Sequence, residues 1–457
     1  MSTSYRPIFH FSPLLGWMND PNGLFYSKGL WHLFYQHEPN QTQHGPMHWG
    51  HAVSRDLVSW EHWPIGLYPD KLGTIWSGSA AVHTRLDGTQ ELVAAFTQDD
   101  AGRGQIQSIA FSDDEGRSWK THENNPVLTS KRPDFRDPKI FRHGDGWIMA
   151  VSGGHEAHFY GSSNLTDWTL LSTFPSPQPG WIWECPDLLQ VDGEWILIVS
   201  FIVPGGLVAE GSRTHYWIGD FDGARFTPRT EPLVLSFGPD DYAAVSWSDA
   251  PHNRKLIIGW MSHWAYAGRT PTEDENWRGA MTLPRELSLH NGTLRQQPPP
   301  ELLALRGQPV PLGSGDIAFE GEAYEIEAEI QVSSSGQSPV GFRLRVGKGE
   351  ATQVLYEPST GELCLDRTRS GQVDFHPEFA ASFRAPLEVA DGILKLRIFV
   401  DRCSVEVFAQ DGALYGAALV FPSEGSLGLE FIGDAARVQR AVIYPCISRE
   451  APHTASG

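Results

Sequence analysis

A short pattern recurs along the first half of the chain, and it constrains the fold more than any other feature of the sequence. Each copy is a polar turn that closes on an aromatic residue where a strand is expected to begin. Three clear copies are Ser54–Trp60, Ser112–Trp119 and Ser162–Trp168, and Asp222–Phe226 is a weaker fourth. The closing aromatic residues follow one another at intervals of 59, 49 and 58 residues. A four-stranded blade needs about 40–50 residues, so roughly 290 residues of this pattern predict a five-bladed β-propeller with a central channel.

Paired strand signals indicate that the chain is all-β. Hydrophobic runs flank short polar turns at residues 24–35, 139–151 and 188–199, and the third turn is an Asp-Gly pair typical of tight hairpins. Turn-forming residues are abundant, with 46 Gly and 33 Pro. Few stretches before residue 295 show a sustained helical period, so helices should contribute little.

The pattern changes near residue 295, which predicts a second domain. The sequence Gln-Gln-Pro-Pro-Pro at 296–300 is typical of a stiff linker. Beyond it, apolar and polar residues alternate with period two, which indicates an antiparallel β-sandwich. One predicted face carries Tyr324, Ile326, Ala328 and Ile330, and the opposite face, expected to be solvated, carries Glu325, Glu327 and Glu329. The predicted domains are a propeller over 1–295, a linker over 296–310 and a sandwich over 311–450.

Charge and cysteine content narrow the possible partners and location. The formal net charge is −20, which disfavours binding to nucleic acids and to anionic membrane surfaces. The four cysteines are expected to be free thiols in a reducing compartment. Residues 1–7 contain no apolar segment of a signal peptide, so a cytoplasmic location is predicted. The longest apolar stretch is interrupted by Ser, Pro and Gly, and we expect no membrane span.

Five polar clusters occur once per repeat, just before the hairpins. Taken at positions 20, 77, 137, 184 and 241, they lie 57, 60, 47 and 57 residues apart, in phase with the closing aromatic residues. Equivalent positions in a propeller converge on the channel, so the clusters are expected to meet at one mouth. They are Asn19-Asp20-Pro21, Trp76-Ser77-Gly78-Ser79, Arg136-Asp137-Pro138, Glu184-Cys185-Pro186 and Asp240-Asp241-Tyr242.

Carboxylates that share one mouth are suited to retaining glycoside hydrolysis, in which one acts as nucleophile and another as acid and base. A third carboxylate nearby helps to raise the pKa of the acid. The alternative is a metal site, because His44, His48 and His51 are spaced like metal ligands. They lie in a Pro- and Gly-rich loop with no carboxylate close in sequence, which favours histidines that hydrogen-bond within the loop or line a subsite. Cys185 has no partner base placed by the repeat, and we expect neither a metal nor a cofactor.

These residues resemble the motifs of a known family. Trp17–Gly23, Trp49–His51, Trp76–Ser79, Arg136–Pro138 and Glu184–Pro186 are similar, in order and spacing, to the motif set of glycoside hydrolase family 32, which includes invertases, levanases and inulinases. Asp401–Phe408 resembles the motif of its C-terminal sandwich, so the resemblance covers nearly the whole chain. The fold that it implies agrees with the one argued above.

The resemblance implies a role for each matching residue. Asp20 would attack the anomeric carbon, Glu184 would act as acid and base, and Asp137 would stabilise the transition state. Arg136 would orient these carboxylates and help to keep Asp137 ionised. The positions that match sugar-contacting residues are Asn19, Gln36, Trp76, Ser77, Arg136 and Trp264. Two positions depart from the pattern: His44 stands where many members carry Trp, and Cys403 replaces a usual Ser.

The resemblance implies a retaining exo-β-fructofuranosidase. Residues 241–247 and 277–285 look like the versions found in exo-acting levanases and inulinases. The substrates would be sucrose, fructo-oligosaccharides or fructans of the levan or inulin type. The expected partner is therefore a small sugar, and neither a nucleic acid nor a membrane is expected. The sequence sets neither the oligomeric state nor the preferred linkage. Two alternatives remain, a fructosyltransferase that uses the same site and a fructan-binding protein without turnover.

Overall fold

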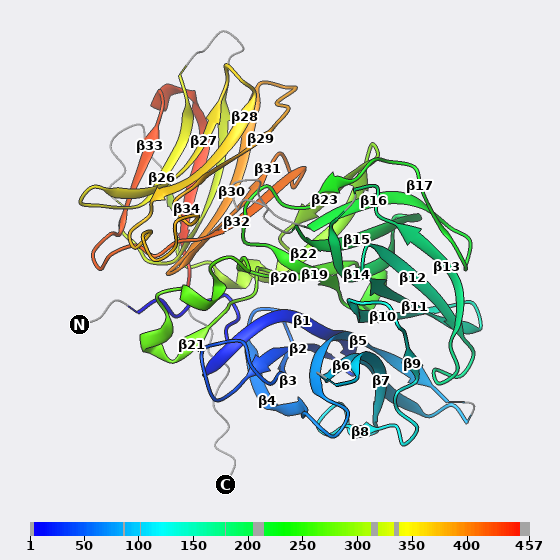
Figure 1. Ribbon diagram of the computed structural model, residues 1–457. Helices are drawn as coiled ribbons and strands as arrows, with labels where there is room; N and C mark the ends of the chain where they lie inside the picture. Colours follow the sequence, from blue (N-terminus) through cyan, green and yellow to red (C-terminus); the bar gives the residue numbers. More distant parts are fainter. Residues whose placement is uncertain are drawn as a thin grey trace.

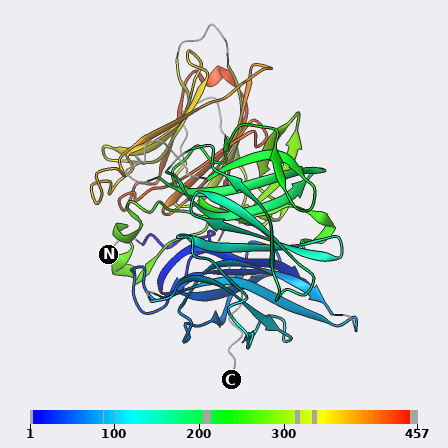
Figure 2. The ribbon, with the colours of Figure 1, turned by 45° about the vertical axis from the view of Figure 1, so that its right-hand side comes forward.

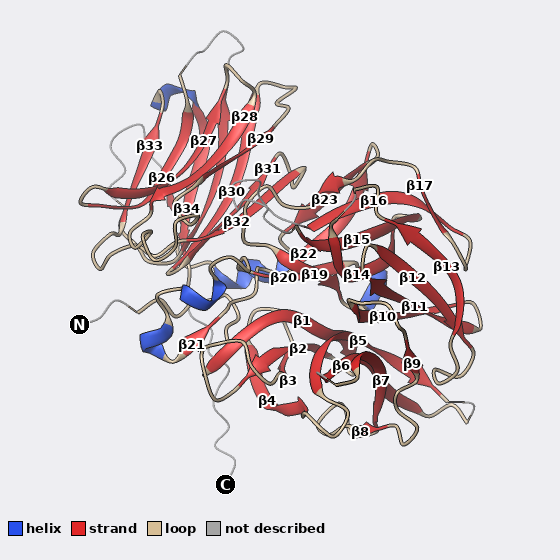
Figure 3. Ribbon diagram, viewed as in Figure 1, coloured by secondary structure: helices blue, strands red, loops and turns tan. Residues whose placement is uncertain are grey.

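The computed structural model describes residues 4–85, 87–100, 102–178, 180–203, 214–311, 319–332 and 338–447. Figure 1 shows two bodies packed side by side, one built from the first part of the chain and one from the last. Strands make up almost all of the regular structure, as Figure 3 shows, and the helices are short 3₁₀ turns. The described helices are η2 (Pro251–Asn253), η3 (Ala267–Arg269), η4 (Glu273–Glu275), η5 (Pro300–Leu305) and η6 (Ala435–Arg437). No helix among the described residues is long and apolar enough to cross a membrane.

Among the described residues, five sheets form the first body, which is consistent with the predicted five blades, and their strands are antiparallel apart from β21 (Trp277–Arg278). The first holds β1 (Gly16–Ser27), β2 (Leu30–Glu38), β3 (His48–Ser54) and β4 (Trp60–Leu67), with β21 parallel to β1. The second holds β5 (Thr74–Thr84), β6 (Gln90–Asp100), β7 (Gly104–Ser112), β8 (Lys120–Thr121) and β9 (Leu128–Thr129). The third holds β10 (Phe135–His143), β11 (Gly146–Gly153), β12 (Glu156–Ser162) and β13 (Thr169–Pro175). The fourth holds β14 (Ile182–Val191), β15 (Glu194–Ile202), β16 (Thr214–Phe221), β17 (Phe226–Pro228) and β18 (Leu233–Val234). The fifth holds β19 (Tyr242–Ser246), β20 (Leu256–Trp260), β22 (Arg285–His290) and β23 (Thr293–Gln297).

The first strands of the five sheets close a ring. β1 contacts β5, β5 contacts β10, β10 contacts β14, β14 contacts β19, and β19 returns to β1. The rotated view in Figure 2 shows the sheets of this body lying one above another. Each blade therefore presents its first strand to the centre, and polar residues on those five strands face a common region.

The repeated turns lead into the outer strands of the blades. In the first copy, Asp56 Oδ1 accepts hydrogen bonds from the backbone N–H groups of Val58 and Ser59, at 3.0 and 2.7 Å. β4 begins at Trp60, and β13 begins directly after Trp168. These turns are stabilised locally by side chains that mimic a backbone turn, which explains why the sequence alone revealed them.

Two stacked sheets form the second body, which is the predicted sandwich. The first, in spatial order, contains β24 (Val310–Pro311), β34 (Val438–Pro445), β25 (Tyr324–Gln331), β30 (Ile393–Asp401), β31 (Ser404–Ala409) and β32 (Leu414–Leu419). The second contains β29 (Ser382–Pro386), β28 (Glu362–Arg369), β27 (Glu350–Glu357), β26 (Val340–Gly347) and β33 (Gly428–Ile432). The apolar face predicted for β25 is buried in the sandwich core.

The opposite face of β25 differs from the expectation of a solvated surface. Glu325 is fully buried and forms ion pairs with Arg306 and Arg397. Glu327 is partly exposed and also contacts both arginines. A buried carboxylate needs such partners, because an unpaired charge would be costly to remove from water.

The two bodies share one apolar cluster. Met261, Tyr266 and Trp277 from the propeller belong to the same buried cluster as the sandwich core. The residues predicted as the start of the linker, 296 and 297, are the last residues of β23, and η5 follows them. Residues 312–318, 333–337 and 448–450 of the predicted sandwich lie outside the described residues.

Candidate active site

The same irregularity occurs in all five innermost strands. The pairing of each strand with its neighbour shifts register, with a bulge in β1, β5, β10, β14 and β19. The interruptions lie between Met18 and Pro21, Ile75 and Gly78, Arg136 and Lys139, Glu184 and Asp187, and Tyr242 and Val245. A bulge re-aims a side chain out of the ladder. In the first four blades the bulge overlaps the predicted polar cluster. In the fifth blade it begins at Tyr242, the last residue of its cluster.

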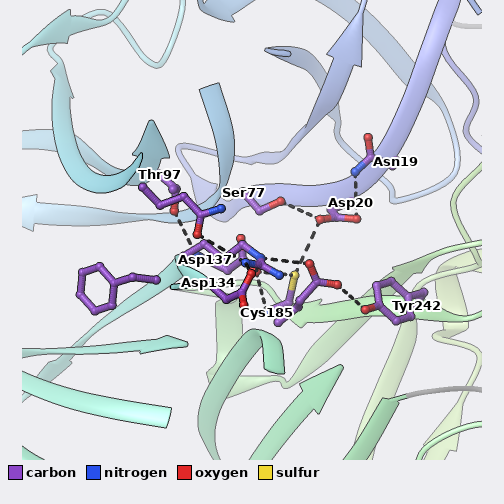
Figure 4. Close-up of polar contacts among 12 residues, drawn as sticks. Asn19, Asp20, Ser77, Thr97, Asp134, Asp137, Cys185 and Tyr242 are labelled. Atoms are coloured by element: carbon purple, nitrogen blue, oxygen red, sulfur yellow. Dashed lines mark hydrogen bonds and ion pairs between the residues drawn. The ribbon is translucent and has the colours of Figure 1, made fainter. Parts of the chain in front are cut away.

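Asp20, on β1, is held from two sides (Figure 4). Its Oδ1 accepts a hydrogen bond from Nδ2 of Asn19 at 3.0 Å, and its Oδ2 accepts one from Oγ of Ser77 at 2.7 Å. Asn19 is fixed in turn by Nε1 of Trp17, which donates to Asn19 Oδ1 at 2.7 Å. The Asp20 carboxylate is therefore buried with a set orientation.

Asp137, on β10, occupies a left-handed backbone conformation with φ of 65°. Its N–H donates to Oγ1 of Thr97 at 2.9 Å, and its Oδ2 accepts from the backbone N–H of Cys185 at 2.9 Å. Non-glycine residues rarely adopt this conformation unless their surroundings hold them in it.

Glu184, on β14, is bound by a cation and a hydroxyl. Nε of Arg136 donates to Glu184 Oε1 at 3.0 Å, and the hydroxyl of Tyr242 donates to Oε2. Arg136 lies farther from Asp137, at 4.0 Å from Nε to Oδ2, and its Nη1 also pairs with Asp134 at 2.6 Å. Arg136 thus binds Glu184 more closely than it binds Asp137.

All three carboxylates are harder to ionise than in water. Burial raises the pKa of Asp137 to about 7, because the charges of Glu184 and Asp20 add to the burial effect while Arg136 opposes it. Burial also raises the pKa of Asp20 and of Glu184. Such groups titrate as a set, so the cluster holds a proton close to neutral pH. One protonated and one ionised carboxyl group are what acid and nucleophilic catalysis require.

Cys185 lies among the carboxylates as a thiol. Its Sγ lies 3.6 Å from Asp137 Oδ2 and 3.8 Å from Asp20 Oδ2. Burial and the neighbouring negative charges raise the pKa of the thiol well above its usual value. A thiolate nucleophile needs a positive environment, so this position suits a weak hydrogen-bond donor.

The remaining predicted sugar-contacting residues surround this cluster at different depths. Gln36 is buried and donates through Nε2 to Asn22 Oδ1 at 2.8 Å. Trp76 is half-buried, and its carbonyl accepts from Nε1 of Trp49 at 3.0 Å. Trp264 is 38% exposed and its ring stacks on Trp17, with centroids 6.3 Å apart.

His44 occupies an aromatic surround beside these tryptophans. Its ring meets those of Trp17, Trp76 and Trp264 edge to face, at 6.1, 6.5 and 5.7 Å. The imidazole therefore joins a rim of aromatic rings, at the position where many members of the family that the motifs resemble carry Trp.

The fifth cluster reaches the site through its tyrosine and not through its acids. Asp240 pairs with Arg367 of the sandwich at 2.6 Å, and Asp241 pairs with Arg285 at 2.6 Å. Tyr242 follows them and bonds Glu184. Tyr242 was present in the in-phase cluster, but no carboxylate spacing could have singled it out.

The prediction of one loop for His44, His48 and His51 is wrong for two of them, because His48 and His51 lie on β3, and the three rings do not converge. His51 is buried, stacks on Phe34 at 3.8 Å and lies 3.1 Å from His32 through their ring nitrogens. His48 instead faces Tyr68 edge to face. Among the described residues, no group of three His, Cys, Asp or Glu side chains is arranged to hold a metal ion.

A propeller whose central strands present three buried carboxyl groups with raised pKa values, beside a rim of aromatic rings, is the framework of a glycoside hydrolase. The comparison with known families agrees. Residues 10–298 match the glycosyl hydrolases family 32 N-terminal domain, and residues 294–445 match the glycosyl hydrolases family 32 C-terminal domain. The chain belongs to glycosyl hydrolase family 32, as the motifs predicted.

Individual relatives and solved structures extend this result. The chain is 44% identical to a levanase of Bacillus subtilis, over 96% of this chain and 70% of the levanase. It is 34% identical to an extracellular exo-inulinase of Aspergillus awamori, over 97% and 95% of the two chains, and the structure of that enzyme aligns with a TM-score of 0.87. The structure of a fructofuranosidase from Schwanniomyces occidentalis complexed with fructose aligns with a TM-score of 0.87 at 28% identity, over 98% of this chain and 99% of that one.

Proposed function

We propose that the protein is a retaining exo-β-fructofuranosidase that releases terminal β-D-fructofuranosyl residues from sucrose, fructo-oligosaccharides and fructans of the levan and inulin types. The main support is one connected cluster of Asp20, Asp137 and Glu184, in which Cys185 contacts Asp20 and Asp137, and Arg136 contacts Asp137 and Glu184. The similar proteins named levanase and exo-inulinase support the choice of fructan as substrate class.

In the proposed reaction, an Asp20 oxygen attacks C2 of the fructosyl unit while Glu184 gives its proton to the glycosidic oxygen. The C2–O bond breaks, the remaining sugar departs as an alcohol, and an ester joins fructose to Asp20. Glu184 then takes a proton from water as the water oxygen attacks C2. The ester breaks, fructose leaves with its configuration retained, and both carboxyl groups return to their starting states.

The surrounding side chains suit these roles. Ser77 and Asn19 hold both oxygens of Asp20 in place, which leaves the carboxylate little freedom to turn away from a substrate. We assign Asp137 to the sugar hydroxyls, where it stabilises the positive charge that develops at C2. Contacts to sugar are assigned to Asn19, Gln36, Trp76, Ser77, Arg136 and Trp264.

A substrate panel tests the function. Sucrose, 1-kestose, inulin and levan are each incubated with the enzyme, and the products are separated by chromatography. We expect free fructose to be the first product from every substrate that is cleaved. Longer oligosaccharides formed at high sucrose would indicate a fructosyltransferase, and binding without any product would indicate a non-catalytic fructan-binding protein.

We propose the cytoplasm as the location of the enzyme. The four cysteines, Cys185, Cys364, Cys403 and Cys446, form no disulfide, which suits a reducing compartment. Immunoblotting of cytosolic and extracellular fractions of the source organism tests this proposal. Recovery in the medium, as the name of the similar Aspergillus exo-inulinase suggests for that protein, would contradict it.

A further inference from the structure

The backbone of Asp137 lies where β10 leaves its own ladder. The pairing of β10 with β11 is interrupted between Arg136 and Lys139, and Asp137 is in the left-handed conformation. Its N–H crosses instead to the neighbouring blade, where it donates to Oγ1 of Thr97 on β6 at 2.9 Å. The hydrogen bond that fixes this residue therefore comes from a different sheet.

Thr97 is the first member of a buried relay. It pairs directly across the sheet with Gln107 on β7, and both residues are fully buried. Thr97 Oγ1 donates to Gln107 Oε1 at 2.8 Å, and Gln107 Nε2 donates to the carbonyl of Phe135 at 2.8 Å. The relay thus starts at the carbonyl of Phe135 and returns to the N–H of Asp137, two residues later on the same strand.

Only one proton arrangement satisfies every member of the relay. The carbonyl of Phe135 can only accept, so the amide nitrogen of Gln107 must face it and Oε1 must face Thr97. The Thr97 hydroxyl hydrogen then points to Gln107, which leaves a lone pair of Oγ1 for the N–H of Asp137. A relay with a single satisfied state fixes geometry better than one with several states.

We infer that Thr97 and Gln107 are positioning residues for catalysis, which clamp the Phe135–Asp137 segment and so aim both Arg136 and Asp137 into the site. This inference rests on the proposed function. Neither side chain bonds the side chain of a proposed catalytic carboxylate in the described structure, so both act through the backbone on which Arg136 and Asp137 are mounted.

Loss of the clamp affects two side chains at once. Without the Thr97 hydroxyl, the N–H of Asp137 is buried without a partner, and the left-handed turn loses its support. Arg136 lies between the two clamped ends and donates to Glu184. Because the positive charge of Arg136 lowers the pKa of Glu184, displacement of Arg136 raises that pKa.

The test uses Thr97→Val, which keeps the shape but removes the hydroxyl, and Thr97→Ser, which restores it. Gln107→Met is the second variant and carries the test if Thr97→Val does not fold. The matched control is Ser108→Ala, because Ser108 is also fully buried and its Oγ donates to Gln98 Oε1 at 2.7 Å, between the same two strands. Values of kcat and KM on sucrose, pH profiles of kcat/KM and melting temperatures are measured for all four variants.

We expect Thr97→Val to lower kcat about 10- to 100-fold, the range that a displacement of about 1 Å produces, with less effect on KM. The basic limb of its pH profile should move to higher pH, and Thr97→Ser should restore both. Ser108→Ala should have a lower melting temperature than the wild type, but its pH profile of kcat/KM should not shift. A Thr97→Val enzyme with wild-type kcat and profile, or a Ser108→Ala enzyme with the same losses as Thr97→Val, would overturn the inference. A wild-type protein that releases no fructose from any substrate would overturn the proposed function instead.

Discussion

The hydroxyl of Tyr242 donates a hydrogen bond to Oε2 of Glu184, and the two residues belong to neighbouring blades. The opposite oxygen of Glu184 is bound by Arg136, from the blade on the other side. The proposed acid is thus held between the fifth and third blades while its own backbone belongs to the fourth. Both partners favour the ionised form, and burial favours the neutral form. The balance keeps Glu184 able to release its proton as well as to hold it.

Replacement of Tyr242 by Phe should disturb this balance in a known direction. The lost hydrogen bond stabilises the carboxylate, so the pKa of Glu184 should rise and the basic limb of kcat/KM should move to higher pH. The pH profile on sucrose measures the shift. Tyr160→Phe, at a buried tyrosine of β12, is the control and should keep the wild-type profile. A Tyr242→Phe profile that moved to lower pH would contradict the proposed role of the hydroxyl.

Asp20, the proposed nucleophile, should control the acidic limb of the pH profile of kcat/KM. Asp20→Asn keeps the size of the side chain and should lower kcat by at least about a hundredfold, because the amide cannot form the ester. Ser77→Ala should have a milder effect. The Ser77 hydrogen bond lowers the pKa of Asp20, so its loss should move the acidic limb to higher pH. An Asp20→Asn enzyme that retained more than about a hundredth of the wild-type rate would remove Asp20 from the mechanism.

The acid and base role of Glu184 can be separated from substrate binding. Glu184→Ala should lose far more rate on sucrose than on an activated β-fructoside, because a poor leaving group needs protonation as its bond breaks. Azide should partly restore turnover of the activated substrate, since a small anion attacks the ester without a general base. Equal slowing of both substrates, with no β-fructosyl azide formed, would point to a purely structural role for Glu184.

Activity should survive removal of metal ions. The proposed reaction uses carboxyl groups for every proton transfer and for the covalent step. Dialysis against EDTA followed by assay on sucrose should leave kcat unchanged. A loss that zinc or manganese restored would instead support a metal site, and His48→Ala would then show whether the histidine at the start of β3 takes part.

The features that the sequence predicted correctly are those with local causes. The repeated turns are stabilised by side chains within a few residues of one another, as in the bonds from Asp56 to Val58 and Ser59. The in-phase clusters were visible because each blade carries a bulge at the same place in its first strand. Periodicity was therefore enough to bring Asp20 and Glu184 to one site.

The features that the sequence did not reveal depend on partners far along the chain. Glu325 lies on the predicted solvated face of β25, but its side chain is buried and forms ion pairs with Arg306 and Arg397. Arg397 is 72 residues away in the sequence. Asp240 pairs with Arg367, which is 127 residues away in the sequence. Tyr242 is therefore the member of this cluster that contacts Glu184. Thr97 is one polar residue within a buried strand, and only the ring of blades places it beside Asp137.

The junction between the two domains contains a buried histidine that should make stability depend on pH. His10 Nδ1 lies 2.8 Å from Asp401 Oδ2, and Nε2 lies 2.7 Å from Glu406 Oε1, with all three side chains fully buried. Burial alone would lower the pKa of His10, but the hydrogen bonds to Asp401 and Glu406 outweigh it and raise the pKa to about 9. The imidazolium therefore joins the propeller side of the junction to the sandwich.

The sign of the effect follows from the two pKa values. A histidine with an ordinary pKa of 6.5 in the unfolded chain and about 9 in the folded one stabilises the fold fully below pH 6.5. That contribution, on the order of 3 kcal/mol, is lost as the pH rises through 9. The melting temperature of the wild-type protein should therefore fall between pH 6.5 and 9.5.

His10→Gln should have a lower melting temperature than the wild type at pH 6.5. Its melting temperature should fall less over the same pH range, because the variant carries no charge to lose. His290→Gln, at an exposed position of β22, is the control and should follow the wild-type curve. Parallel curves for the wild type and His10→Gln would show that His10 is uncharged in the folded protein.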